Sequence, residues 1–94
     1  MNLKTLIKLA PNQVSCELEG ESVILNLQSG VYYGLDPIGA VIWKLMEQPS
    51  TVASVRDAVL EKFEVDTEQC EKDLFALLEK LSQEGLIEIS EAVA

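Results

Sequence analysis

The first regular pattern along the chain is an alternation of apolar and polar residues. Val14, Cys16 and Leu18 are apolar, and polar residues separate them. Successive side chains of a β-strand point to opposite faces, so this period of two is typical of a strand with one buried face. The pattern therefore predicts a strand that buries these three side chains.

Two further strands are expected, and short turns at residues 19–21 and 28–30 separate them. Glycine in each turn can adopt a positive φ without a steric penalty. The inner face of the second strand is expected to consist of Val23, Leu25 and Leu27. The third strand, residues 31–35, is rich in β-forming residues. Three strands joined by tight turns predict an antiparallel meander whose third strand is an edge.

The period of the apolar residues then changes from strand to helix. Asp36 is a favourable N-cap, and Pro37 suits the first helical position because its missing N–H is not needed there. A second helix is expected after Ser50 or Thr51, and a third after Asp66. The apolar stripe of the third helix consists of Cys70, Leu74, Leu77, Leu78 and Leu81. Gly85 then suits the C-terminal cap.

The complete pattern predicts a single α+β domain over residues 1–94. A three-stranded antiparallel meander precedes three helices, and residues 86–89 form a brief closing strand. The tight link between the second and third helices makes this arrangement winged helix-turn-helix-like. Residues 1–12 are either a loose arm or a short extra strand, and residues 90–94 are expected to be a tail.

Charge changes what such a fold is expected to bind. Sixteen acidic and seven basic residues give a formal charge of −9. The third predicted helix carries six acidic residues against Lys72 and Lys80, so the phosphates of DNA would repel it. Nucleic acid and anionic membrane surfaces are therefore poor partners. No apolar run is long enough for a membrane span, and we expect a cytoplasmic protein.

The residues offer little catalytic chemistry. The chain has no histidine, and Cys16 and Cys70 stand alone, so we expect two core thiols and neither a metal nor a cofactor. No nucleophile motif or phosphate-binding glycine loop is present, which argues against an enzyme. The open backbone edge of residues 31–35 favours a peptide-binding module. A transcriptional regulator and a dimerisation module that uses the same edge are the alternatives.

The third helix suggests a wall for a peptide groove. Phe75 lies about 140° from Cys70 around this helix, so the apolar surface extends beyond the core stripe. Leu74, Phe75 and Leu78 would form a wall beside the edge strand, or Phe75 would pack on a neighbouring element.

The residues of the edge strand are also open to more than one interpretation. Tyr33 shares its face with Val31 and Leu35 and is expected in the core. Tyr32 lines the groove or faces water. Gly34 permits the close approach of a second backbone, or forms a bulge.

The order and spacing of four segments resemble the PqqD family, small domains also called RiPP recognition elements. The resemblance runs from about residue 14 to residue 89. It rests on LNLQSGVYYGLD (25–36), PIGAVIWKLM (37–46), STVASVRDAVLEKFEVD (50–66) and KDLFALLEKLSQEGLIEI (72–89). Within the family, the GVYYGLD stretch looks most like the stand-alone leader-binding proteins of lasso-peptide clusters.

This resemblance implies a non-catalytic adaptor. Family members bind the leader segment of a ribosomally made precursor peptide as an added strand and present it to modifying enzymes. For a lasso cluster these are a leader peptidase and an ATP-dependent macrocyclase, and for PqqD itself the partner is a radical-SAM maturase. The peptide-binding residues implied are Val31, Tyr32, Tyr33, Gly34, Leu35, Leu74, Phe75 and Leu78. The identity of the leader and the modification installed remain open.

Overall fold

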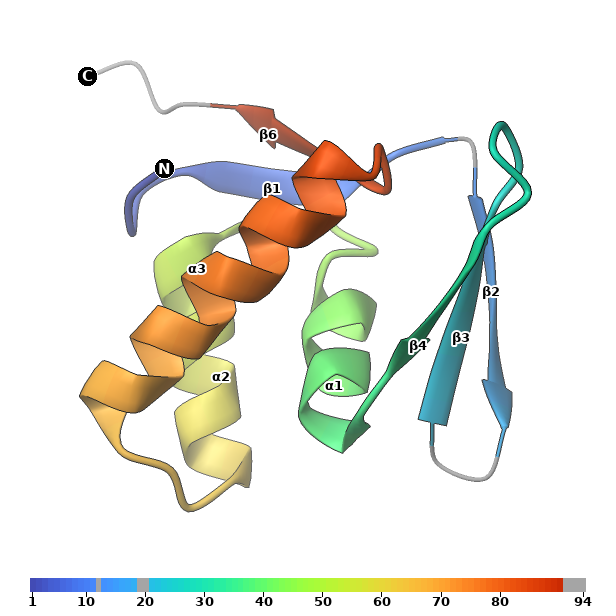
Figure 1. Cartoon of the computed structure of the whole chain (residues 1–94). Helices are drawn as coiled ribbons and strands as arrows, with labels where there is room; N and C mark the ends of the chain where they lie inside the picture. The colour runs from blue at the N-terminus through green and yellow to red at the C-terminus, as the bar shows by residue number, and fades with distance from the viewer. Residues whose placement is uncertain (12, 19–20, 91–94) are drawn as a thin grey trace.

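The computed structural model describes residues 1–11, 13–18 and 21–90 of the chain. Three helices are present in this part, and α1 lies between one sheet and the other two helices (Figure 1). The strands are β1 (Leu6–Leu9), β2 (Gln13–Leu18), β3 (Glu21–Asn26), β4 (Tyr32–Leu35), β5 (Ser50–Thr51) and β6 (Ile87–Ser90). The helices are α1 (Pro37–Leu45), α2 (Val52–Lys62) and α3 (Thr67–Gln83). The predicted α+β content and the three helices are confirmed.

The predicted meander is present as a sheet of order β2-β3-β4, antiparallel throughout. Its register pairs Val14 with Leu25 and Ile24 with Tyr33. Within this sheet β4 pairs with β3 alone, so the expectation that the third strand is an edge is confirmed.

A second sheet, of order β5-β1-β6, covers another side of the helices (Figure 1). Its central strand is β1, so Leu6–Leu9 form the extra strand that was one of the two expectations for residues 1–12, of which residue 12 lies outside the described part of the chain. The predicted closing strand is β6, which pairs with β1 in the register Ile7 to Ile89. Ser90 belongs to β6 rather than to the expected tail, and residues 91–94 lie outside the described part of the chain.

The buried face of the meander differs from the prediction. Ile24 is completely buried, whereas Leu27 is 57% exposed. Val14 and Cys16 are exposed too, because the register places them opposite Leu25 and Val23 on the outer face. The buried face of β3 consists of Ser22, Ile24 and Asn26. The prediction was wrong for β3 and for the Cys16 thiol, because the meander carries apolar residues on both of its faces.

The helix boundaries follow the predicted caps. The Oδ1 atom of Asp36 accepts a hydrogen bond from the Gly39 amide at 2.7 Å, and Pro37 occupies the first position of α1. Thr51 caps α2 and Asp66 caps α3 in the same way. After α3, Gly85 has φ of +72°, and the Leu86 amide bonds to the Leu81 carbonyl at 3.0 Å.

A core of apolar side chains joins the helices to both sheets. Ile24 and Leu35 come from the meander, Trp43 and Met46 from the end of α1, and Ile7 from the second sheet. The same cluster includes α2 and α3 through Val52, Val55, Val59, Leu74, Leu78 and Leu81. A change in one layer therefore affects the packing of the others.

The assignment of the buried face of β3 can be tested directly by two substitutions. We expect Ile24→Ala to lower the free energy of unfolding by about 2–5 kcal/mol, because it leaves a cavity in the core. Leu27→Ala should change it by about 0.5 kcal/mol or less, because that side chain is exposed. Urea denaturation of both variants measures the difference. Equal losses in the free energy of unfolding would contradict the burial of Ile24 and the exposure of Leu27.

Candidate functional site

A groove with a volume of about 340 Å³ opens between the end of β4 and α3. Its walls and floor are mainly apolar and come from β4, α1, α2 and α3. The apolar lining includes Leu35, Ile38, Ile42, Val59, Leu74 and Leu77. Asp36, Gln69 and Asp73 supply polar groups, and among the described residues no lysine or arginine lines the groove. The groove therefore suits apolar side chains, with neutral or basic groups beside them.

Close packing of α1 beneath β4 shapes one side of the groove. A Cβ atom added at Gly39 would lie 3.3 Å from the Cβ atom of Leu35 and 3.2 Å from Oδ1 of Asp36. Contacts that short are tighter than most real Cβ contacts, so a larger residue would require the Leu35 and Asp36 side chains to shift by a few tenths of an ångström. Gly39 thereby permits the close approach between the start of α1 and the last residue of β4.

The free edge of β4 runs beside this groove. The Asn26 amide donates to the Val31 carbonyl at 3.0 Å, which marks that pair as hydrogen-bonded. Antiparallel ladders alternate between bonded and non-bonded pairs, so Tyr33 and Leu35 also direct their backbone groups toward β3. The N–H and C=O groups of Tyr32 and Gly34 consequently point outward from the sheet. They are available to an added strand.

The opposite edge of the meander, β2, has a different character. Ser15 and Glu17 lie opposite Ile24 and Ser22, so they face the buried side of the sheet at its edge. An inward-facing charge on an edge strand discourages further pairing. The sequence of β4, YYGL, has no charged residue. The free β4 edge is thus the less protected of the two.

The structure brings together part of the predicted site. Gly34, Leu35 and Leu74 all line the groove. Leu78 is completely buried in the core, and Phe75 lies in a separate hollow with Met1, Glu79 and Ile89. Of the two interpretations of Phe75, packing on a neighbouring element agrees with this position. The groove face of α3 consists of Cys70, Leu74 and Leu77, which recur at intervals of four and three residues.

The two tyrosines face opposite sides of the sheet. Tyr32 is 69% exposed and lies opposite Leu25 on the outer face. Tyr33 is half-buried on the inner face, and its hydroxyl donates to Oε2 of Glu84 at 2.5 Å. This hydrogen bond raises the pKa of Tyr33 above its ordinary value. Val31 precedes β4 and is exposed, and Gly34 pairs regularly with Val23 rather than forming a bulge.

Sequence reasoning missed the contribution of α1 and of two polar residues on α3. Ile38 and Ile42 lie one helical turn apart, and both line the groove. Gln69 and Asp73 lie at the same spacing, and the Gln69 amide donates to Asp73 Oδ1 at 2.8 Å. The glycine at position 39, one turn into an apolar helix, is a sequence signal of the close approach to β4.

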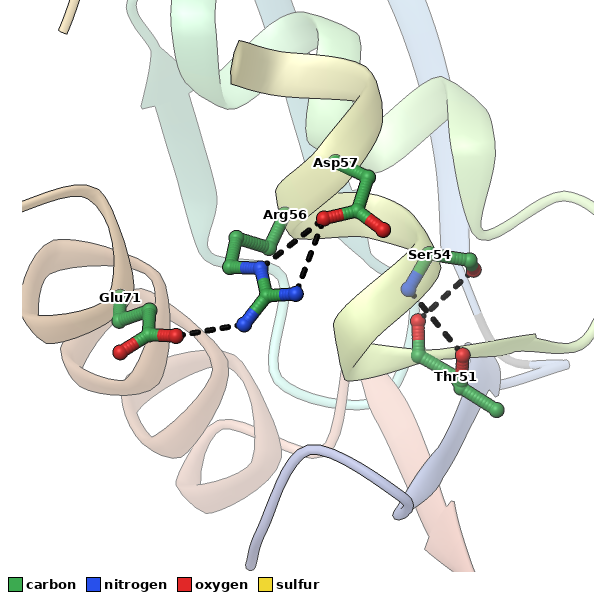
Figure 2. Close-up of polar contacts among 5 residues, drawn as sticks. All are labelled: Thr51, Ser54, Arg56, Asp57 and Glu71. Atoms are coloured by element: carbon green, nitrogen blue, oxygen red, sulfur yellow. Dashed lines mark hydrogen bonds and ion pairs between the residues drawn. The ribbon is translucent and has the colours of Figure 1, made fainter. Parts of the chain in front are cut away.

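A polar contact away from the groove holds α3 against α2. The Arg56 guanidinium lies 2.6 Å from Glu71 Oε1 and 3.0 Å from Asp57 Oδ1 (Figure 2). These carboxylates raise the pKa of Arg56, so the cation persists at any ordinary pH. The contact fixes the N-terminal half of α3, from which the groove residues project.

The family model described as Coenzyme PQQ synthesis protein D (PqqD) matches residues 21–87. The chain belongs to the PqqD family. The match includes β3, β4 and all three helices, and hence every element that lines the groove.

Two solved structures share this fold. TbiB1, determined in complex with the TbiA(beta) leader peptide, is 36% identical with a TM-score of 0.80, covering 86% of this chain and 94% of TbiB1. A lasso peptide synthetase B1, complexed with the leader peptide, is 24% identical with a TM-score of 0.77. That alignment covers 87% of this chain and 96% of the synthetase chain. No curated protein matches the chain in sequence. Among the described residues, no helix is long and apolar enough to cross a membrane.

The two cysteines provide a probe of the groove. Cys70 lines it and is buried, and burial raises the pKa of its thiol above the ordinary value. At a given pH a smaller fraction of Cys70 is therefore in the reactive thiolate form than for a thiol of ordinary pKa. We expect N-ethylmaleimide to modify the exposed Cys16 several-fold faster in the folded protein, as measured by mass spectrometry of the peptides. Equal rates in the folded protein would contradict the burial of Cys70.

Proposed function

We propose that this chain is a non-catalytic adaptor that binds the leader segment of a ribosomally synthesised precursor peptide and presents it to modifying enzymes. The observation that carries the proposal is an uncharged, open strand edge running beside an apolar groove. Two similar structures hold leader peptides, and TbiB1 is 36% identical to this chain, which supports the same class of ligand.

In the proposed mode of binding, the leader adds as a strand along β4. The outward backbone groups of Tyr32 and Gly34 fix its register, and apolar leader side chains enter the groove. Burying each anchor contributes about 1.5–3 kcal/mol. Two or three anchors together contribute about 3–9 kcal/mol, which offsets much of the cost of association and of ordering the segment. The backbone hydrogen bonds of the added strand contribute further.

The groove side of this proposal involves α1 as well as α3. Leu74 and Leu77 form the α3 wall, and Ile38 and Ile42 form the floor. Phe75 and Leu78 are left out of the proposed contact surface because they lie elsewhere in the structure.

We further propose that the enzymes served are the leader peptidase and the macrocyclase of a cytoplasmic lasso-peptide pathway. Likeness to a lasso peptide synthetase B1 and to TbiB1 supports this choice over a radical-SAM maturase. We also propose that the domain is winged-helix-like. Transcriptional regulators share such folds, but the acidic residues of α3 would be repelled by the phosphates of DNA, which argues against that function.

The whole proposal is tested by titrating labelled leader segments into the full chain. The probes are the leader from the precursor gene that lies nearest to this chain's own gene, and the TbiA(beta) leader. Saturable anisotropy, with protection of Cys70 but not Cys16 from N-ethylmaleimide, is the expected result. Binding of neither leader would overturn the proposal.

The open edge gives a sharper test with two neighbouring positions. Tyr32→Pro removes an outward N–H and leaves the bonds to β3, so the protein should stay folded. Leader affinity should fall about tenfold or more, because the guest carbonyl loses its donor. Tyr33→Pro should instead destabilise the fold, because that N–H faces β3. Circular dichroism and anisotropy measure the two effects.

Tyr32→Ala is the control for the lost side chain. It keeps the backbone donor and should retain more affinity than Tyr32→Pro. If the alanine and proline variants bind equally well, the edge does not pair with the leader.

The groove wall is tested by a matched pair on α3. Leu77→Asp places a charge among apolar side chains and should weaken leader binding by more than about tenfold. Ala76→Asp adds the same charge at an exposed position that does not line the groove, and it should bind like the unmodified chain. Calorimetric titration of both folded variants decides the matter. Comparable affinities would exclude Leu77 from the site.

A further inference from the structure

Asn26 joins the β3–β4 hairpin to the C-terminal end of α3. Its side-chain carbonyl accepts from the amides of Gln28 at 2.9 Å and Ser29 at 3.2 Å, which fixes the turn. Its amide nitrogen donates to the backbone carbonyl of Glu84 at 2.8 Å. The residue is buried, and its side chain bonds both to the turn and to the cap of α3.

Tyr33 makes a second connection to the same residue. Its hydroxyl reaches the Glu84 carboxylate from the inner face of β4. Within the described part of the chain, these are the two hydrogen bonds between the hairpin and the end of α3. Among the described residues, no backbone–backbone hydrogen bond joins the hairpin to this end of α3, and β4 pairs only with β3 in its sheet.

These contacts lie at one end of the groove. Leu35 lines the groove, and Tyr33, two residues earlier on the same face of the strand, bonds to Glu84. On α3, Leu77 lines the groove, and Glu84 follows it by two helical turns, about 10 Å along the axis. The two walls are thus joined just beyond the point where the groove ends.

We propose that Asn26 and Tyr33 are positioning residues that hold β4 and α3 at the separation the leader requires before it binds. The inference rests on the proposed function. When the groove already has its final width, leader binding does not have to order the groove walls, and less free energy is lost on binding. The affinity for the leader therefore depends on the bonds of Asn26 and Tyr33 to Glu84, although neither side chain lines the groove. Their loss lets the walls separate while the two sheets stay intact.

The test uses three conservative substitutions. Tyr33→Phe removes only the hydroxyl. Asn26→Asp keeps the side-chain oxygen that accepts from the turn amides and removes the nitrogen that donates to the Glu84 carbonyl. This substitution is made together with Glu84→Gln, as a double variant, so that two carboxylates do not lie side by side. Glu84→Gln alone keeps an acceptor for Tyr33 and serves as the conservative control.

The first readout needs no ligand. We expect N-ethylmaleimide to modify Cys70 several-fold faster in Tyr33→Phe and in the double variant, with Cys16 unchanged. Glu84→Gln should behave like the unmodified chain. Ile7→Val, a core change in the other sheet, is the control for lost stability, which urea denaturation measures in every variant.

The second readout is the anisotropy titration with the same leader probes. We expect Tyr33→Phe and the double variant to bind the leader several-fold more weakly than the unmodified chain. Ile7→Val should bind it normally. If Tyr33→Phe and the double variant match Ile7→Val in the rate of Cys70 modification at equal stability, Asn26 and Tyr33 have only a structural role. That result would overturn the inference. Because the cysteine readout is made on the free protein, this failure is distinct from a failure of leader binding.

Discussion

The organisation of the site depends on β4 having a hydrogen-bonded neighbour on one side only. Every strand must direct half of its backbone groups to each side, and at β4 the groups of Tyr32 and Gly34 face no partner strand. Tyr32 and Gly34 are both exposed, and the sequence of β4 has no charge to discourage pairing. The helices instead leave an apolar groove along the same border. An extended peptide is the ligand that satisfies both surfaces at once.

Local chemistry made the helices and their ends predictable. Asp36, Thr51 and Asp66 each accept a backbone hydrogen bond at the start of a helix, and Gly85 adopts the positive φ that ends the last one. These interactions span three or four residues, so the sequence alone contains the information. The edge position of β4 followed in the same way from two tight turns.

The face of a strand that is buried depends on partners distant in the sequence. Val23, Leu25 and Leu27 look like an inner face, yet Asn26 is buried because Glu84, 58 positions later, supplies its acceptor. The position of Phe75 in a separate hollow has a related cause. The amount of apolar surface on α3 was correct, but nothing local revealed that a second sheet covers one side of that helix. The floor contributed by α1 was hidden likewise, since core and groove residues have the same composition.

The contact between Arg56 and Glu71 has a consequence for how the groove adapts to different ligands. Together with the bonds at Glu84, it anchors α3 at two points 13 residues apart, about 20 Å along the helix. The wall between these contacts carries Leu74 and Leu77, and the same helix is packed into the core through Leu74, Leu78 and Leu81. Because core packing and both contacts oppose a tilt of α3, rotamer changes within the groove are the easier way to accommodate ligands of different shape.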